Sequence, residues 1–170
     1  ISGLEHQGWD QSAHGPFRNR CDYGYGPYYC GLLIHACMNS RRAGVNALVN
    51  GLCSKSPAIR TGCAASICLV NTQRGKNVDA VGFLDHLAPH AVTPLSDLLR
   101  EDSPRHKRAA LNGLRGLGRR VNAALPQILA LINDQNEEVR SPAISTTGFV
   151  GGPREEVTQK YALLLPLFLE

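Results

Sequence analysis

A pattern that returns every 33 residues constrains this sequence more than any other feature. Its clearest copy is the stretch 92–118, where two apolar runs at helical spacing flank a turn that contains Asp102, Ser103 and Pro104. Serine is a favourable N-cap, and proline is tolerated at the first helical position because its missing N–H would be unpaired there anyway. The stretch therefore predicts two short helices. Their apolar faces consist of Val92, Leu95, Leu98 and Leu99, then Ala110, Leu111, Leu114 and Leu117.

The same pattern recurs on both sides of this stretch. The apolar positions 33 residues downstream hold Leu125, Ile128, Leu131, Ile132, Ala143, Ile144 and Val150. Upstream the offset is 47, and the matching positions hold Val45, Leu48, Leu52, Cys63, Ile67 and Val70. The longer offset predicts an insertion at about 73–91. A period in the thirties made of helix pairs is typical of an α-solenoid, in which each pair buries its apolar face only against its neighbours.

Three further positions narrow the choice among solenoids. A proline stands near the start of the first helix, an aspartate lies in the turn (Asp102, Asp134), and a basic residue follows near the start of the second helix and is succeeded by a closing glycine. The basic residues are Arg60, Lys107 and Arg140. Over roughly residues 43–170 these features resemble the HEAT-repeat family, especially its short, PBS-lyase-like form. The resemblance implies an all-α fold, a right-handed α-solenoid of stacked antiparallel helical hairpins, in which the basic residues pair with turn aspartates as a structural ladder.

The predicted domain organisation follows from these units. Residues 1–27 are rich in glycine and proline, which break helices, and hold several of the aromatic residues. We expect them to form an irregular N-terminal cap over the open end of the first helical layer, and the alternative is a groove lined by Tyr25 and the nearby Tyr28. The repeat domain covers residues 28–170, with units at about 28–40 (partial), 41–72, 92–118, 125–151 and 154–170 (partial).

Two prolines argue against helical structure at particular places. Pro142 falls well inside the second helix of the unit 125–151 and is expected to kink or delay it. Pro89 argues against a helix that would bring His86 and His90 onto one face beside Asp85. With no third ligand nearby, neither a metal site nor a cofactor is expected.

The composition favours a single globular domain. The 170 residues are 43% hydrophobic and 19% charged, which is enough apolar material for one continuous core. No apolar run reaches the roughly 18 residues of a membrane span. Six cysteines without a Cys-x-x-Cys pair predict reduced thiols in a cytoplasmic protein, whereas Cys21 and Cys30 could be bridged if the chain is exported.

The net charge of +4 is unevenly placed, because the segment 105–120 contains six basic residues and no acidic one. No nucleotide-binding, hydrolase or zinc-protease motif occurs, so no catalytic residue is assigned and no enzymatic activity is expected. The leading hypothesis is a non-catalytic scaffold that binds a protein or acidic peptide on a concave face lined by the second helices. The candidate partner-binding residues are Arg60, Arg105, Lys107, Arg108, Asn112, Arg115, Arg119, Arg140, Tyr25 and Tyr28.

Three other interactions stay open at this point. The segment 105–120 could bind the phosphate backbone of a nucleic acid, although its basic residues belong to one unit and do not continue along the array. Similarity to PBS-lyase-like repeats implies, as a further alternative, an accessory subunit or lyase for a tetrapyrrole chromophore. The last predicted helix, 155–169, has an apolar edge that could mediate self-association.

Overall fold

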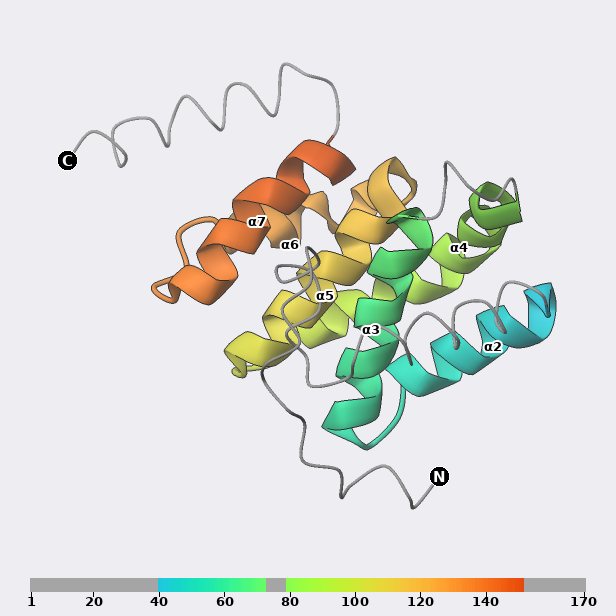
Figure 1. The fold of residues 1–170 in the computed structure, drawn as a ribbon. Coiled ribbons are helices and arrows are strands. Elements are labelled where there is room, and N and C mark those ends of the chain that lie inside the picture. The colour runs from blue at the N-terminus through green and yellow to red at the C-terminus, as the bar shows by residue number, and fades with distance from the viewer. Residues whose placement is uncertain (1–39, 73–78, 152–170) are drawn as a thin grey trace, which may run out of the picture.

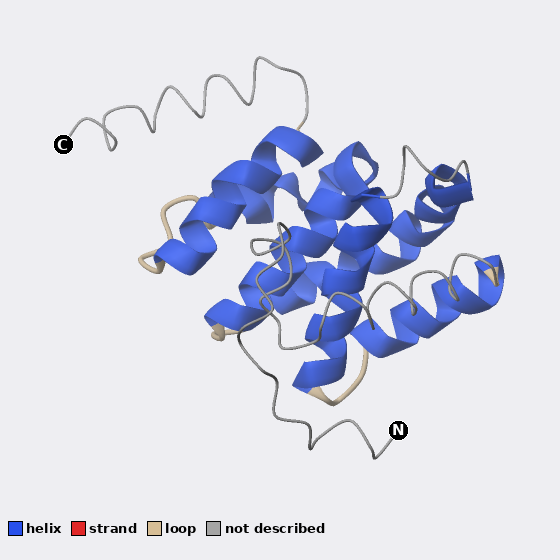
Figure 2. Ribbon diagram, in the orientation of Figure 1, coloured by secondary structure: helices blue, strands red, loops and turns tan. Residues whose placement is uncertain are grey.

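The computed structural model describes residues 40–72 and 79–151, and the structural statements below concern these residues. They fold into helices and contain no strand (Figure 2). The all-α prediction is therefore confirmed for this part of the chain. The predicted cap 1–27, nearly all of the partial unit 28–40, and the final unit 154–170 with its helix 155–169 lie outside the described residues.

The helices pair into successive hairpins. The first consists of α2 (Arg41–Leu52) and α3 (Pro57–Thr72), the second of α4 (Asp79–Leu99) and α5 (Pro104–Leu117), and the third of α6 (Leu125–Ala130) and α7 (Glu137–Val150). A 3₁₀ segment, η1 (Gly118–Ala124), joins the second hairpin to the third. Figure 1 shows the hairpins following one another from α2 on the right to α7 on the left.

The first helices of the hairpins pack side by side in one layer, and the second helices pack side by side in another. α5 packs against both α3 and α7, so the second helices of the hairpins form one layer. α4 packs against α2, η1 and α6, which form the other layer (Figure 1). This is the stacking of hairpins predicted for an α-solenoid, while its right-handed sense and the unit boundaries stay predictions.

The apolar faces predicted from residue spacing meet between the two layers. Leu95, Leu111, Leu114 and Ile128 are fully buried there. Three predicted core positions, Val92, Leu131 and Ile144, are only partly buried. The remaining predicted core residues are buried: Val45, Leu48, Leu52, Cys63, Ile67, Val70, Leu98, Leu99, Ala110, Leu117, Leu125, Ile132, Ala143 and Val150.

Helix α4 begins earlier than the sequence pattern predicts, at Asp79 inside the predicted insertion, and it continues through Pro89 and Pro94. The expectation that Pro89 prevents a helix here was wrong. The physical reason is burial. The buried apolar face that contains Leu95 extends toward the start of the same helix, and its burial offsets the loss of the hydrogen bonds that the prolines remove. The buried residues of that extension are Ala80, Phe83, Leu84, Leu87, Ala88 and Ala91.

The helix ends around the third hairpin are defined by a glycine and an asparagine. α5 ends at Leu117 and is followed by Gly118, the predicted closing glycine, whose φ of +63° is readily adopted only by glycine. α7 begins at Glu137 and contains Pro142, so the helix is not delayed in the way that this proline predicted. The first turn of α7 is stabilised by an N-cap, because the Asn136 side chain accepts a hydrogen bond from the Glu138 backbone N–H at 2.9 Å.

Helices α3 and α5 approach so closely that backbone meets backbone. A Cβ atom on Gly116 would lie 2.7 Å from the Cα of Cys68 and 2.7 Å from the carbonyl oxygen of Ile67. A Cβ atom on Gly113 would lie 3.2 Å from the carbonyl oxygen of Ala64. Glycine at these two positions therefore sets the distance between the second helices.

Replacing Leu114 by Ala is expected to lower the free energy of unfolding by about 2 to 5 kcal/mol, because it leaves a cavity in a fully buried site. Ile59→Ala is the control, since Ile59 is 44% exposed. Denaturant unfolding of both variants measures the difference. Equal unfolding midpoints for Leu114→Ala and the wild type would contradict the core assignment.

Gly116→Ala is expected to lower the free energy of unfolding by about 1 to 3 kcal/mol, because the new methyl group collides with backbone atoms that cannot rotate away. Gly148→Ala is the matched control within a helix, since no heavy atom of the residues that the structure describes lies within 4 Å of its added Cβ. There the loss of glycine flexibility should stabilise by about 0.5 to 1 kcal/mol. Thermal unfolding of the two variants should thus show shifts of opposite sign.

Candidate partner-binding surface

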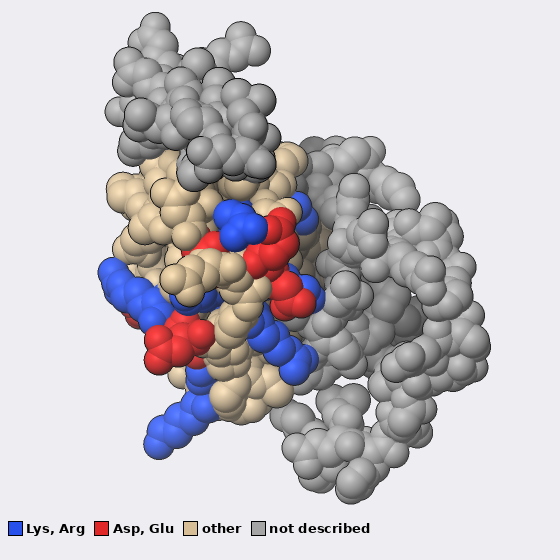
Figure 3. Space-filling model, turned by 90° about the vertical axis from the view of Figure 1, so that its left-hand side faces the viewer, with Lys and Arg blue, Asp and Glu red and all other residues tan. Residues whose placement is uncertain are grey.

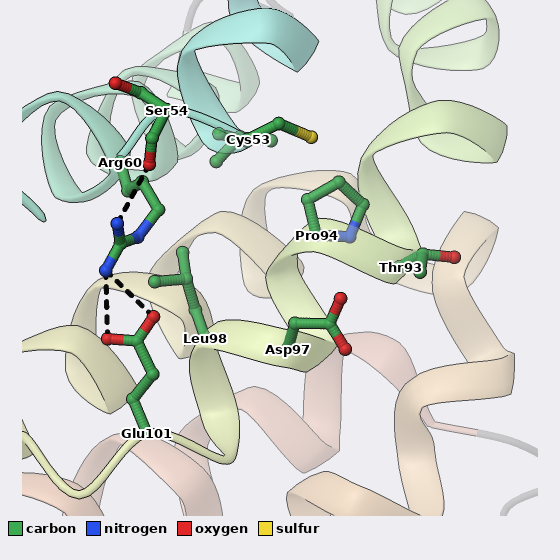
Figure 4. A pocket seen from close by; sticks show the side chains of 9 residues that line it. Cys53, Ser54, Arg60, Thr93, Pro94, Asp97, Leu98 and Glu101 are labelled. Carbon is green, nitrogen blue, oxygen red and sulfur yellow. Dashed lines mark hydrogen bonds and ion pairs between the residues drawn. The ribbon is translucent and has the colours of Figure 1, made fainter. Parts of the chain in front are cut away.

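Arg60, near the start of α3, links the first hairpin to the second. Its Nη2 donates to both carboxylate oxygens of Glu101, at 3.0 and 3.2 Å, and its Nη1 donates to the carbonyl oxygens of Ser54 (2.9 Å) and Lys55 (3.1 Å). Figure 4 shows the Arg60 guanidinium, which belongs to the first part of α3, reaching toward Glu101, which follows α4. Glu101 also contacts Nδ1 of His106. These contacts hold two turns together and engage the charge of Arg60 inside the fold.

Lys107 makes the corresponding contact one unit further along. Its Nζ lies 3.1 Å from Oδ2 of Asp134, in the turn before α7. The backbone N–H of Asn136 donates to the other oxygen of the same carboxylate at 2.9 Å. This hydrogen bond lowers the pKa of Asp134 against the opposing effect of burial, and the charges of Lys107 and Arg140 lower it further. Asp134 is therefore held in its ionised form within the turn.

Arg140 is the third basic residue of the predicted ladder, and it pairs within its own unit. Its Nη1 donates to the carbonyl oxygen of Asp134 at 3.0 Å, and its Nη2 pairs with the Glu137 carboxylate. Among the described residues, this last basic position thus makes contacts of the same kind as Arg60 makes with the turn of its own hairpin.

The predicted pairing of the basic residues with turn aspartates is confirmed for Lys107, whereas Arg60 and Arg140 have glutamate partners. Lys107 pairs with Asp134 of the next unit, as predicted. Arg60 pairs with Glu101 and not with the neighbouring Asp102. Because positions 101 and 134 are 33 residues apart, both ion pairs join the basic residue of one unit to the equivalent turn position of the next.

At least three cations of the predicted basic segment have carboxylate partners. Arg108 lies 3.9 Å from Glu138, and Arg120 pairs with Asp85. Lys107 is the third. On the face shown in Figure 3, the side toward which α7 lies in Figure 1, basic and acidic side chains are intermixed. The segment therefore presents less net positive charge than its sequence suggests.

The other predicted site residues lie at different places. Arg105 is exposed at the start of α5, Asn112 is half-buried in the middle of that helix, and Arg119 is exposed in η1. Tyr25 and Tyr28 lie outside the described residues. The eight candidates that lie within the described residues therefore do not gather into one cluster.

Arg115 stands apart from the other cations, because it reaches both neighbouring second helices. Its Nη2 lies 3.7 Å from Sγ of Cys68 on α3, and its guanidinium carbon lies 5.9 Å from the centroid of the Phe149 ring on α7. Phe149, which is 54% exposed, was missed by sequence reasoning. An aromatic residue standing off the buried stripe of α7 was the available signal.

An open pocket of about 450 Å³ lies beside the ion pair of Arg60 and Glu101 (Figure 4). The rest of its wall consists of Leu52, Cys53, Ser54, Thr93, Pro94, Asp97 and Leu98. Asp97 is itself paired with Arg100 at 2.8 Å, so both carboxylates of the pocket are engaged in ion pairs. The buried Nε of Arg60 has no hydrogen-bond partner among the described residues.

The predicted absence of a metal site rested partly on Pro89, and that reason does not hold. Asp85, His86 and His90 lie on one continuous helix, where all three are exposed. Within residues 40–72 and 79–151, however, no group of three or more His, Cys, Asp or Glu side chains is placed to hold a metal ion. In the same ranges, no helix combines the length and the apolar character that crossing a membrane would need.

The Asp134 carboxylate should make stability depend on pH in acid. Since folding lowers its pKa, its contribution is fully present above the ordinary value near 3.8 and is lost as the pH falls through the lowered value. Asp134→Asn removes that titration, so the stability gap between wild type and variant should narrow below about pH 4. Urea unfolding across pH measures the gap, with Asp102→Asn, in the exposed part of the preceding turn, as control. A gap that stays constant from neutral to acid pH would contradict the assignment.

Comparison with known proteins agrees with this architecture. Among curated proteins, none matches the sequence. Residues 92–166 match the family model described as HEAT repeats, a segment that contains the described helices α5, α6 and α7 and the last part of α4. The HEAT-repeat resemblance read from the residue spacing is thus confirmed for this segment of the chain.

Proposed function

We propose that the chain is a non-catalytic binding scaffold that holds a protein or peptide partner on the concave face of a short HEAT array. HEAT repeats generally mediate protein–protein interactions as scaffolds, and the family is typically non-catalytic. In this proposal the binding face is the layer of second helices, α3, α5 and α7. Function in repeat proteins depends on the surface side chains, so the proposal has to be argued from them.

The stacking of α3, α5 and α7 into one layer is the observation that supports the proposal best. Each of these helices packs one face against the core. Their outer faces lie side by side and form a surface that runs across three units. Arg115 from α5 and Ser145 and Phe149 from α7 lie outside the core and outside the ion pairs that connect the units. Such side chains are available to a partner without loss of the fold.

The charge balance favours an acidic partner. The chain carries a net charge of +4. Among the described residues, neither Arg115 nor Arg119 has a carboxylate partner, unlike Arg60, Lys107 and Arg140. Complementary charge mainly increases the rate and specificity of association. An acidic peptide or an acidic protein surface therefore fits this face better than a basic one.

Nucleic-acid binding has less support than it had from sequence alone. Affinity for a phosphate backbone comes from cations that exchange small counterions for phosphates. Lys107, Arg108 and Arg120 already face carboxylates, so each would have to leave an ion pair to contact a phosphate. A continuous track of available cations is thus missing from the described part of this segment.

Selection of random linear peptides on the immobilised full chain tests the proposal. We expect the recovered peptides to be enriched in Asp and Glu and to bind at moderate salt concentration. A labelled single-stranded DNA of random sequence serves as the competing ligand, and true phosphate-backbone binding should weaken by about a thousandfold between about 50 and 200 mM salt. Recovery of no binding peptide, or DNA binding with that salt dependence, would overturn the proposal.

A further inference from the structure

Arg115 is held in place by three separate interactions. Its guanidinium lies over the Phe149 ring at 5.9 Å and beside Sγ of Cys68 at 3.7 Å. It also stands in the last turn of α5, where a cation interacts favourably with the helix dipole. None of these three interactions supplies a negative ion. The side chain is therefore held by contacts to both neighbouring helices, while no carboxylate of the described residues pairs with its positive charge.

The surroundings of Phe149 leave the ring accessible. Phe149 is 54% exposed, and its neighbour Gly148 is exposed as well. Among the described residues, no heavy atom lies within 4 Å of the position that a Gly148 Cβ would take. Ser145, one turn earlier on α7, is also exposed. A side chain from another molecule can therefore lie against the ring and over Gly148 without displacing any part of α7.

We propose that Arg115 and Phe149 form the centre of the binding face and recognise an acidic side chain of a protein segment that stands next to a large apolar side chain. The inference rests on the proposed function and specifies its partner. The partner's carboxylate would bind the guanidinium, whose planar fork matches its two oxygens. The adjacent apolar side chain would cover Phe149, and arginine and aromatic residues are common centres of such interfaces.

Charge complementarity favours a carboxylate-bearing peptide over a polyanion. One ordered cation matches one carboxylate, and the exposed Arg119 nearby in sequence can meet a second. A nucleic acid would bring a row of phosphates, and those beyond Arg115 would meet Arg108 and Arg120, which already face Glu138 and Asp85. The exposed ring also needs an apolar group to cover it, which a phosphate does not provide.

The test uses the labelled synthetic peptide Ser-Gly-Asp-Phe-Glu-Gly-Ser and its neutral counterpart Ser-Gly-Asn-Phe-Gln-Gly-Ser. Amide chemical shifts of the full chain should move at Arg115, Gly148 and Phe149 when the acidic peptide is added, and much less with the neutral one. Arg115→Gln, which removes a charge-assisted contact, and Phe149→Ala, which removes an apolar contact, should each weaken binding of the acidic peptide by about tenfold. Arg115→Lys keeps the charge without the fork and should recover part of the affinity.

The control variant is Arg100→Gln, which removes one positive charge from an exposed arginine on the other layer, 65% exposed and paired with Asp97. It should leave both the shifts and the affinity unchanged. Circular dichroism and thermal unfolding establish that each variant is folded. Inorganic phosphate is added separately to show whether any small anion produces the same shifts.

Four outcomes would overturn the inference. These are equal shifts with the neutral peptide, shifts confined to residues away from Arg115 and Phe149, equal affinities of Arg115→Gln and Arg100→Gln, and the same shifts with phosphate alone. If peptides recovered by random selection still bind elsewhere on the layer, the scaffold proposal survives this failure. If no peptide of any kind binds, both proposals fail together.

Discussion

The backbone contact between α3 and α5 determines how the rest of the array is placed. At Gly116 the two helices come so close that a Cβ atom would meet the backbone at Ile67 and Cys68. This short distance brings the second helices into one layer and lets Leu114 fill the space toward the first helices. It also brings Arg115, the residue next to Gly116, within reach of the Cys68 thiol. Packing and candidate site thus depend on the same contact.

Most of the fold could be predicted because burial leaves a periodic trace in a sequence. Leu95, Leu114 and Ile128 recur at fixed spacing, and each is fully buried. Repetition strengthened this signal, because an ambiguous position in one unit can be assigned from the equivalent positions in the others. The closing role of Gly118 was predictable for a related reason, because few other residues tolerate its positive φ.

The failures came where local preference and tertiary burial compete. Pro89 locally disfavours a helix, yet α4 continues through it because a long apolar stripe on the same helix is buried. In α7, which also continues through a proline, Pro142, a local feature helps instead, because the Asn136 side chain caps the start of the helix. Residue spacing alone could not show which effect prevails, since that depends on the neighbour against which each helix packs.

The candidate surface was harder to predict than the core, because charge pairing depends on distances between units. The segment 105–120 reads as a basic patch, but Asp85 and Glu138 come from elsewhere in the chain and face two of its arginines. The exposure of the Phe149 ring and its position beside Arg115 are shown only by the structure. Conversely, Arg60 and Lys107 were considered for binding and turned out to connect units. The role of a surface residue can therefore be assigned only when its neighbours from other units are known.

The ion pairs between units also give the array a direction. Each joins a basic residue of one hairpin to an acid in the following turn, and the first hairpin has Ser54 at the position of that acid. A duplicated copy of the central hairpin would carry both halves of the contact and could be inserted at an interior joint by gene duplication. A copy of the first hairpin inserted at the same joint would carry Ser54 in place of the acid and would interrupt the series of ion pairs between units. Lengthening of such a protein over evolution is thus easier from the middle than from the front.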